Sequence, residues 1–355
     1  MRTTAAYSCR FRRAPGTRPF DRIDARTIRD VRWLRRAWLL LPLAAVVLLA
    51  GTIYLPYYGI GPGPAKPVGP LIRFDDRQRY ESDGSFVLTS IHYEQLTPIG
   101  VLQAWLDPDR SVVSREFLFR PGETLEEEEE RSISQMDQSK LDAAYVVLHE
   151  LASYPEQHGD GVVIEAVVDG CAADGELFPG DLVTAIDGTR VDDVGDARRA
   201  IRARPSGQRL TFDVTVDGEP QTVSLVRKPC GGSQRPLVGV SMIARFPFEV
   251  RISSGDIGGP SAGLAWALGL YDLLTPGDLS GGRTIAVTGQ VGLDGTVYPI
   301  GAPDEKVAAA ADAGATVLIL PEDNLEEARS IGDRGVELVP VSSFEDALAY
   351  LQGNA

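Results

Sequence analysis

Lysine is scarce in this sequence of 355 residues. The four lysines are Lys66, Lys140, Lys228 and Lys306, and every other basic side chain except the histidines is arginine. None of the four follows a glycine, which excludes a G-x-x-x-x-G-K-[ST] phosphate loop and any ATPase built on one. None has a serine three residues before it, which also excludes the S-x-x-K arrangement of penicillin-binding enzymes.

Histidine and cysteine are equally sparse, with three of each. The histidines are His92, His149 and His158, so none lies in the last 197 residues of the chain. Cys9, Cys171 and Cys230 show no metal-binding spacing and do not cluster with the histidines. The sequence therefore predicts neither a metal site nor a cofactor.

Negative charge dominates the chain outside its first 36 residues. Those 36 hold eleven Arg and three Asp, although the net charge of the whole chain is −15. An acidic body repels the phosphate backbone of nucleic acids, so a nucleic-acid partner is not expected.

An uncharged segment follows the Arg-rich start and runs from residue 37 to 65. Residues 37–58 are long and apolar enough to be a single transmembrane helix, with Trp38 and Tyr54 near its two ends. The Arg-rich tail, 1–36, would stay in the cytoplasm, and the remainder would lie outside the cell membrane. A cleaved signal peptide is the alternative, but the apolar run is too long for one.

Residues 59–150 are predicted to be a Gly/Pro-rich linker followed by an α+β region with no assigned role. Residues 151–230 are β-rich and include the stretch 179–188, PGDLVTAIDG, which resembles PDZ domains of bacterial membrane-linked proteases. PDZ domains bind an extended peptide as an added strand. The resemblance implies peptide binding at Gly159, Gly161, Val162 and Val163. The alternative is a PDZ fold that serves only as a spacer.

Cys171 and Cys230 both fall outside the membrane in this topology, where disulfides persist. They could bridge the ends of the PDZ-like region. Two free buried thiols are slightly favoured, because the sequence gives no distance between them.

The last region, 236–355, alternates strands and helices, which predicts an α/β domain. Ser261 stands at a glycine-rich entry to an apolar helix, and Lys306 lies just inside the start of another. A serine nucleophile needs a base beside it. With no histidine in the region, Lys306 is the candidate, provided that burial lowers its pKa to near 7. Backbone N–H groups around Ser261, at Gly259 and Ala262, would stabilise an oxyanion.

Two motifs in this region resemble the proteolytic domain of Lon proteases, over about residues 236–345. They are GGPSAG at 258–263 and P-I-G-x-x-x-E-K at 299–306. The resemblance implies Ser261 as nucleophile and Lys306 as its partner. The segment AVTGQV at 286–291 likewise places the Thr288 hydroxyl near the lysine. Gly258, Ala302, Pro303 and Gln290 depart from the family pattern without removing the Ser-Lys pair.

Together these features predict three parts: a transmembrane helix, a PDZ-like β-rich domain and a C-terminal Lon-type α/β domain. The predicted function is an ATP-independent serine endopeptidase for unfolded or tail-tagged proteins outside the cytoplasm. A homo-oligomer is possible. The alternative is an inactive adaptor that binds peptide tails at the membrane. A short distance between the Ser261 hydroxyl and the Lys306 ammonium would favour the enzyme.

Overall fold

The computed structural model describes residues 41–42, 44–75, 77–152, 160–216, 218–230, 233–332 and 334–353. The chain divides into two units, residues 1–53 and 54–355, of which the second holds all the strands described below.

The predicted membrane span, 37–58, falls partly on residues 37–40 and 43, which lie outside the described residues. Residues 41–42 and 44–50 are helical. The helix then ends in a turn, where the N–H of Gly51 donates to Val47 and the Thr52 hydroxyl donates to the Leu49 carbonyl. The predicted end at residue 58 is therefore wrong, because a strand begins at Tyr57. Within the described ranges, no helix has the length and apolar character needed to cross a membrane.

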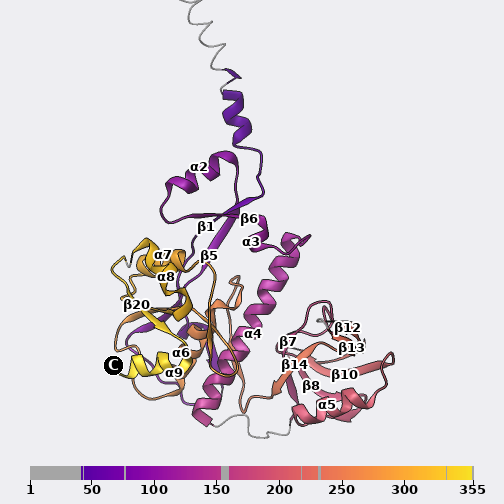
Figure 1. Ribbon diagram of the computed structural model, residues 1–355. Coiled ribbons are helices and arrows are strands. Elements are labelled where there is room, and N and C mark those ends of the chain that lie inside the picture. Colours follow the sequence, from indigo (N-terminus) through magenta and orange to yellow (C-terminus); the bar gives the residue numbers. More distant parts are fainter. Residues whose placement is uncertain are drawn as a thin grey trace, which may run out of the picture. The chain divides into compact units, whose positions relative to one another are not determined.

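A small antiparallel sheet follows, with the strand order β5-β1-β6. Its strands are β1 (Tyr57–Pro62), β5 (Ile91–Gln95) and β6 (Ser111–Ser114), and it carries the helices α2 (Pro98–Leu106) and α3 (Arg115–Leu118). The start of the predicted linker is thus the central strand of a sheet (Figure 1).

The central sheet of the large unit has five strands in the order β2-β4-β16-β19-β20. They are β2 (Lys66–Pro67), β4 (Ser85–Leu88), β16 (Thr284–Val287), β19 (Val317–Pro321) and β20 (Glu337–Val341). β4, β16, β19 and β20 are parallel, and β2 is antiparallel to β4. Residues 59–150 therefore supply two strands to the sheet that the sequence assigned to 236–355 alone.

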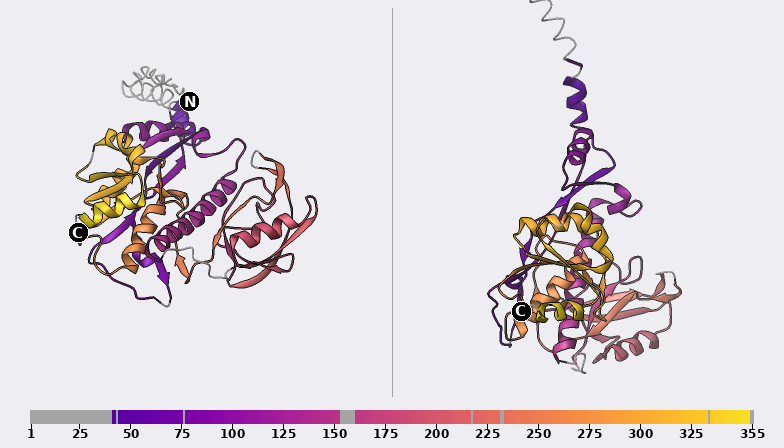
Figure 2. Two further views of the ribbon diagram at one scale, coloured as in Figure 1. Left: turned by 60° about the horizontal axis from the view of Figure 1, so that its bottom comes forward. Right: turned by 60° about the vertical axis from the view of Figure 1, so that its left-hand side comes forward.

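Helices cover both faces of this sheet, as a parallel sheet requires. On one face, α4 (Leu125–Ala152), α6 (Gly263–Leu274) and α9 (Phe344–Gly353) pack with Ile285 and Val287. On the other face, α7 (Pro303–Asp312) and α8 (Leu325–Ala328) form a core cluster with Ala286 of β16. Figure 2 shows α4 running alongside α6, whose Trp266 is fully buried.

Short elements complete the unit. Three pairs of strands form small ladders: β3 (Ile72–Phe74) with β15 (Val250–Ile252), β12 (Lys228–Cys230) with β13 (Ser233–Leu237), and β17 (Gln290–Val291) with β18 (Val297–Tyr298). The 3-10 turns are η1 (Gly69–Leu71), η2 (Pro260–Ala262), η3 (Glu322–Asn324) and η4 (Arg329–Ile331).

A second sheet has the strand order β11-β10-β8-β7-β14, with β9 (Thr189–Arg190) beside β8. Its strands are β7 (Val162–Val167), β8 (Leu182–Ile186), β10 (Arg209–Val216), β11 (Glu219–Val226) and β14 (Val240–Ala244), and α5 (Val194–Ala203) packs on it. Ile164, Phe212 and Ala197 belong to its separate core. The sequence assigned residues 240–244 to the catalytic domain, whereas β14 pairs with β7 in this sheet.

Cys171 and Cys230 form a disulfide, with their Cα atoms 5.1 Å apart and a sequence separation of 59. The slight preference for free thiols is therefore wrong: the fold brings the two ends of the β-rich domain together. Gly239 lies against this bridge, and a Cβ added to it would come 2.0 Å from the Cβ of Cys171. Its φ of 87° also favours glycine.

We expect the Cys171→Ser, Cys230→Ser double variant to be less stable by ~4 kcal/mol, because the bridge closes a long loop in the unfolded chain. Denaturant unfolding, followed by a spectroscopic signal from this domain, would measure the loss of stability. A reductant should destabilise the wild type by the same amount and leave the double variant unchanged. Equal midpoints for the oxidised wild type and the double variant would contradict the expectation.

Candidate active site

The loop before α6 presents Ser261 to the surface. Gly259 has φ 82°, a conformation that side chains other than glycine disfavour, and Pro260 then opens the turn η2. Ser261 is partly exposed, while Ala262 and the start of α6 behind it are buried. The serine hydroxyl is thus held on a rigid support and remains within reach of a ligand.

Lys306 reaches the serine from the first turn of α7. This helix begins after Ala302, which has φ 55°, and Pro303 occupies its first turn. The Lys306 side chain runs inward and the residue is only 2% exposed. Its Nζ lies 2.6 Å from the Ser261 Oγ and 3.0 Å from the Thr288 Oγ1. The structure therefore brings together the three side chains that the motifs singled out.

Burial lowers the pKa of Lys306 to about 7. An ammonium group loses its hydration in an apolar environment, which favours the neutral amine. Burial alone accounts for the shift, so the neighbouring carboxyls of Asp304 and Glu305 do not hold the lysine in its charged form. A substantial fraction of Lys306 is therefore able to accept a proton near neutral pH.

Thr288 orients this lysine. Its hydroxyl donates to the carbonyl oxygen of Ser261 at 3.2 Å, which uses its only proton. The Thr288 oxygen must then accept a hydrogen bond from Nζ at 3.0 Å. With one N–H directed at Thr288, the lone pair of a neutral Nζ is available to the Ser261 hydroxyl.

The backbone N–H groups around Ser261 differ in their hydrogen bonding. The N–H of Gly259 donates to the carbonyl of Ser132 at 2.8 Å, so it is occupied by a partner from α4. That contact contradicts the expectation that Gly259 offers its N–H to an oxyanion. The N–H groups of Ser261 and Ala262 stand at the start of η2 and α6, where the helix dipole favours negative charge.

Two contributions to the site escaped the sequence analysis. The side-chain amide of Asn324 clamps the loop before α7, accepting from the N–H of Ile300 at 2.8 Å and donating to its carbonyl at 3.0 Å. The second is helix α4, which holds the loop of Ser261 through Ser132 and Ser139. Neither position has a motif, because both depend on contacts between distant parts of the chain.

The predicted peptide site on β7 is not available for an added strand. Gly159 lies outside the described residues. Val162 and Val163 pair with β8 on one side and with β14 on the other, so both edges are already used. Gly161, at φ 113°, packs against β8, where an added Cβ would come 2.7 Å from the carbonyl of Val183. The outer strand on this side of the sheet is instead β14, and α5 lies against it.

Comparison with known proteins agrees with both parts of this architecture. Residues 247–352 match the Lon protease (S16) C-terminal proteolytic domain, and residues 143–226 match the PDZ domain. The chain thus contains a Lon-type proteolytic domain and a PDZ domain. The segment matched to the proteolytic domain includes Ser261, Thr288 and Lys306.

Relatives of the Lon-type domain span several bacteria. The chain is 39% identical over 105 residues to a Lon protease of Trichlorobacter lovleyi, covering 28% of this chain and 13% of that protein. It is 36% identical over 92 residues to Lon protease 2 of Bacillus subtilis (26% and 16%), and 32% over 179 residues to a Lon protease of Rickettsia typhi (45% and 23%). The chain therefore spans less than a quarter of the length of these relatives.

Among solved structures, the PDZ domain of an SdrC-like protein from Listeria monocytogenes aligns over 24% of the length of this chain and 88% of its own length. It has 21% identity and a TM-score of 0.22.

The reactivity of Ser261 should rise with pH through about 7, because the neutral amine of Lys306 predominates above its pKa. The rate of labelling by a fluorophosphonate, followed across this range, measures it. Burial raises the pKa of Glu305 to about 7 as well, so the Glu305→Gln variant serves as the control and should keep the profile. A rate that does not change through this range would exclude Lys306 as the base.

Proposed function

We propose that this protein is an ATP-independent serine endopeptidase in which Ser261 is the nucleophile and Lys306 the general base. One observation carries the proposal: a buried amine with its pKa lowered to about 7 lies 2.6 Å from a partly exposed serine hydroxyl. Serine is a weak nucleophile until a neighbouring base removes its proton, and this geometry supplies that base.

The steps follow from this geometry. The Ser261 Oγ attacks the carbonyl carbon of the scissile peptide bond while its proton passes to Nζ. The N–H groups of Ser261 and Ala262 stabilise the resulting oxyanion. Collapse of the intermediate breaks the C–N bond, and Nζ returns its proton to the leaving amine. A water then attacks the acyl-enzyme with the same base, releasing the new carboxyl end and restoring Ser261.

The substrate class follows from the chain's content. The sequence has no phosphate loop, so we propose unfolded or tail-tagged protein chains as substrates, which need no ATP-driven unfolding. The disulfide favours an oxidising compartment. With the Arg-rich start and the uncharged segment 37–65, it supports a protein held at the cell membrane with its catalytic domain outside the cytoplasm.

The PDZ domain would select substrates by their carboxyl ends. We place the peptide on the outer edge of β14, beside α5, rather than on β7. The loop that precedes β14 contains Gly239, whose positive φ turns the backbone there. Backbone N–H groups of such a loop are suited to a terminal carboxylate.

The variants Ser261→Ala and Lys306→Ala should each lower the turnover of an unfolded protein by at least ~10³-fold, as loss of either member of a catalytic pair does. The matched controls are Ser224→Ala and Lys228→Ala, which remove the same side chains from exposed strands of the PDZ domain. Unchanged circular dichroism would show that the variants fold. Undiminished cleavage by either variant would instead make the protein a peptide-binding adaptor.

A peptide with a free carboxyl end should compete with a protein substrate, whereas the same peptide with an amidated end should not. The carboxylate supplies the charge that a loop of N–H groups recognises. A photoreactive residue near the peptide's end should crosslink to residues 238–244 or to α5. Crosslinks confined to β7 and β8 would contradict this placement, and equal competition by both peptides would contradict carboxylate recognition.

A further inference from the structure

Helix α4 supports the loop that carries Ser261 at three points. The carbonyl of Ser132 accepts from the N–H of Gly259 at 2.8 Å. The Ser132 side chain fills the space beside Gly258, where an added Cβ would come 2.3 Å from its Oγ. Two turns further on, the buried hydroxyl of Ser139 donates to the carbonyl of Pro260 at 3.0 Å.

These contacts lie on one face of α4. Ser132, Met136 and Ser139 are spaced four and three residues apart, so they stack along the same side of the helix. Met136 lies between the two serines, and its sulfur accepts from the indole N–H of Trp266 in α6 at 3.4 Å. A rotation or shift of α4 would therefore displace residues 258–260, which lead directly into Ser261.

Gln138, the residue before Ser139, points to the PDZ domain. Its side-chain amide donates to the Glu165 carboxylate on β7 at 2.7 Å. Asp142, one turn later, is 4% exposed and also faces Glu165, which is 5% exposed. Burial and the nearby Glu165 carboxyl raise the pKa of Asp142 to about 8, so at neutral pH it is mostly a protonated acid. Gln138, Asp142 and Glu165 form a small buried polar cluster, here called the α4–β7 joint.

A β-bulge presents Glu165 to this joint. Ile164 pairs with Met242 and Ala166 pairs with Ser241, which leaves Glu165 as the extra residue on β7. Bulges redirect a side chain out of the regular alternation of a strand. The partner strand is β14, so the edge proposed to take the peptide is one strand away from Glu165.

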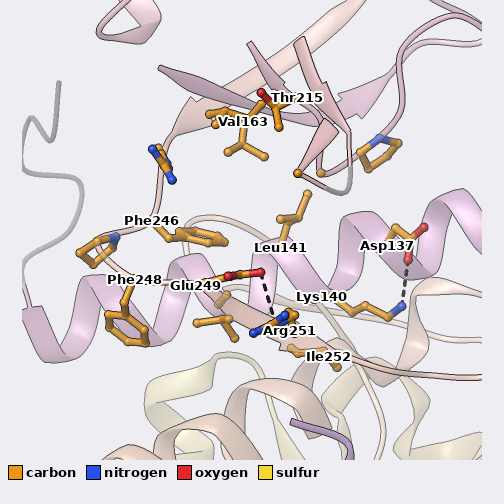
Figure 3. Close-up of a pocket in the computed structure, with 18 of the residues that line it drawn as sticks. Asp137, Lys140, Leu141, Val163, Thr215, Phe246, Phe248, Glu249, Arg251 and Ile252 are labelled. Atoms are coloured by element: carbon orange, nitrogen blue, oxygen red, sulfur yellow. Dashed lines mark hydrogen bonds and ion pairs between the residues drawn. The ribbon is translucent and has the colours of Figure 1, made fainter. Parts of the chain in front are cut away.

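The joint is narrow, because a cavity of about 850 Å³, which residues 245–252 also line, separates the neighbouring residues of α4 from the PDZ domain. Figure 3 shows Leu141 and Lys140 of α4 on one side of the cavity and Val163 and Thr215 on the other. An interface that contains such a cavity is not closely packed. The few polar contacts of the joint therefore have a large share in fixing the position of α4 against β7.

We propose that α4 couples the PDZ domain to the nucleophile, with Gln138 and Glu165 as positioning residues. Their contact holds α4 where Ser132 and Ser139 support the loop of Ser261. Occupancy of β14 changes that support through the bulge at Glu165. This inference rests on the proposed function for its effect on rate, but the coupling itself is structural.

Kinetics of the full-length chain test the joint. Gln138→Ala and Glu165→Ala should each lower kcat by roughly tenfold, since small displacements of catalytic groups reduce rates by up to 10²-fold. The substrate is a short peptide with an amidated end, so that it does not engage the PDZ domain, and KM should not change. Glu165→Gln and Asp142→Asn, which keep the hydrogen-bonding groups, should each retain most of the wild-type kcat.

The matched control is Gln135→Ala, which removes the same side chain one turn earlier on α4. It should leave kcat unchanged. Because Gln138 and Glu165 act through one contact, the double variant should be no slower than the slower single variant. Additive losses, a matching loss in Gln135→Ala, or an unchanged kcat in both single variants would overturn the proposal.

Hydrogen exchange separates this inference from the proposed function, because it needs no turnover. In the Ser261→Ala background, Gln138→Ala should speed exchange in residues 257–263, where the N–H of Gly259 is held by Ser132. A PDZ-binding peptide should change exchange in the same segment. If neither changes it, the coupling is wrong even in an active protease. If both change it but the wild type hydrolyses nothing, the coupling stands and the proposed function fails.

Discussion

The candidate active site depends on the burial of one amine. Lys306 is enclosed at the start of α7, and burial lowers its pKa from 10.5 to about 7. At ~1.4 kcal/mol per pKa unit, the protein destabilises the protonated form relative to the neutral amine by about 5 kcal/mol more than water does. The enclosing layers come from distant segments: β16 brings Thr288, η3 brings Asn324, and α7 brings the lysine itself. The site is therefore as sensitive to the packing of the sheet as to its own side chains.

The nucleophile has a different kind of support. In the loop that carries Ser261, α4 binds the N–H of Gly259 and the carbonyl of Pro260, and residues 288–289 bind the carbonyl of Ser261. The same arrangement explains Gly258, a departure from the Lon pattern, because the Ser132 side chain occupies the space that a Cβ would need. The support of the Ser261 loop thus includes α4, which lies outside the segment matched to the proteolytic domain.

The two recognised domains are also joined more closely than their boundaries suggest. The strand β14 completes the PDZ sheet, and a short segment connects it to β15 and then to the loop of Ser261. In sequence, β14 follows Cys230 of the disulfide and precedes Ser261, so it connects the PDZ domain to the proteolytic domain. A peptide bound along β14 would lie on the strand from which the chain continues, through β15, to the loop of Ser261.

Local motifs were enough to identify the two domain types and the candidate catalytic residues. Ser261, Thr288 and Lys306 lie in such motifs, and the absence of a later histidine left the lysine as the candidate base. Tertiary structure decided what has no local signal: the Cys171–Cys230 bridge, the strands that residues 59–150 give to the central sheet, and the pairing of β14 with β7. These features are contacts between segments far apart in the chain. A sequence pattern records which face of an element is apolar, but not which partner covers it.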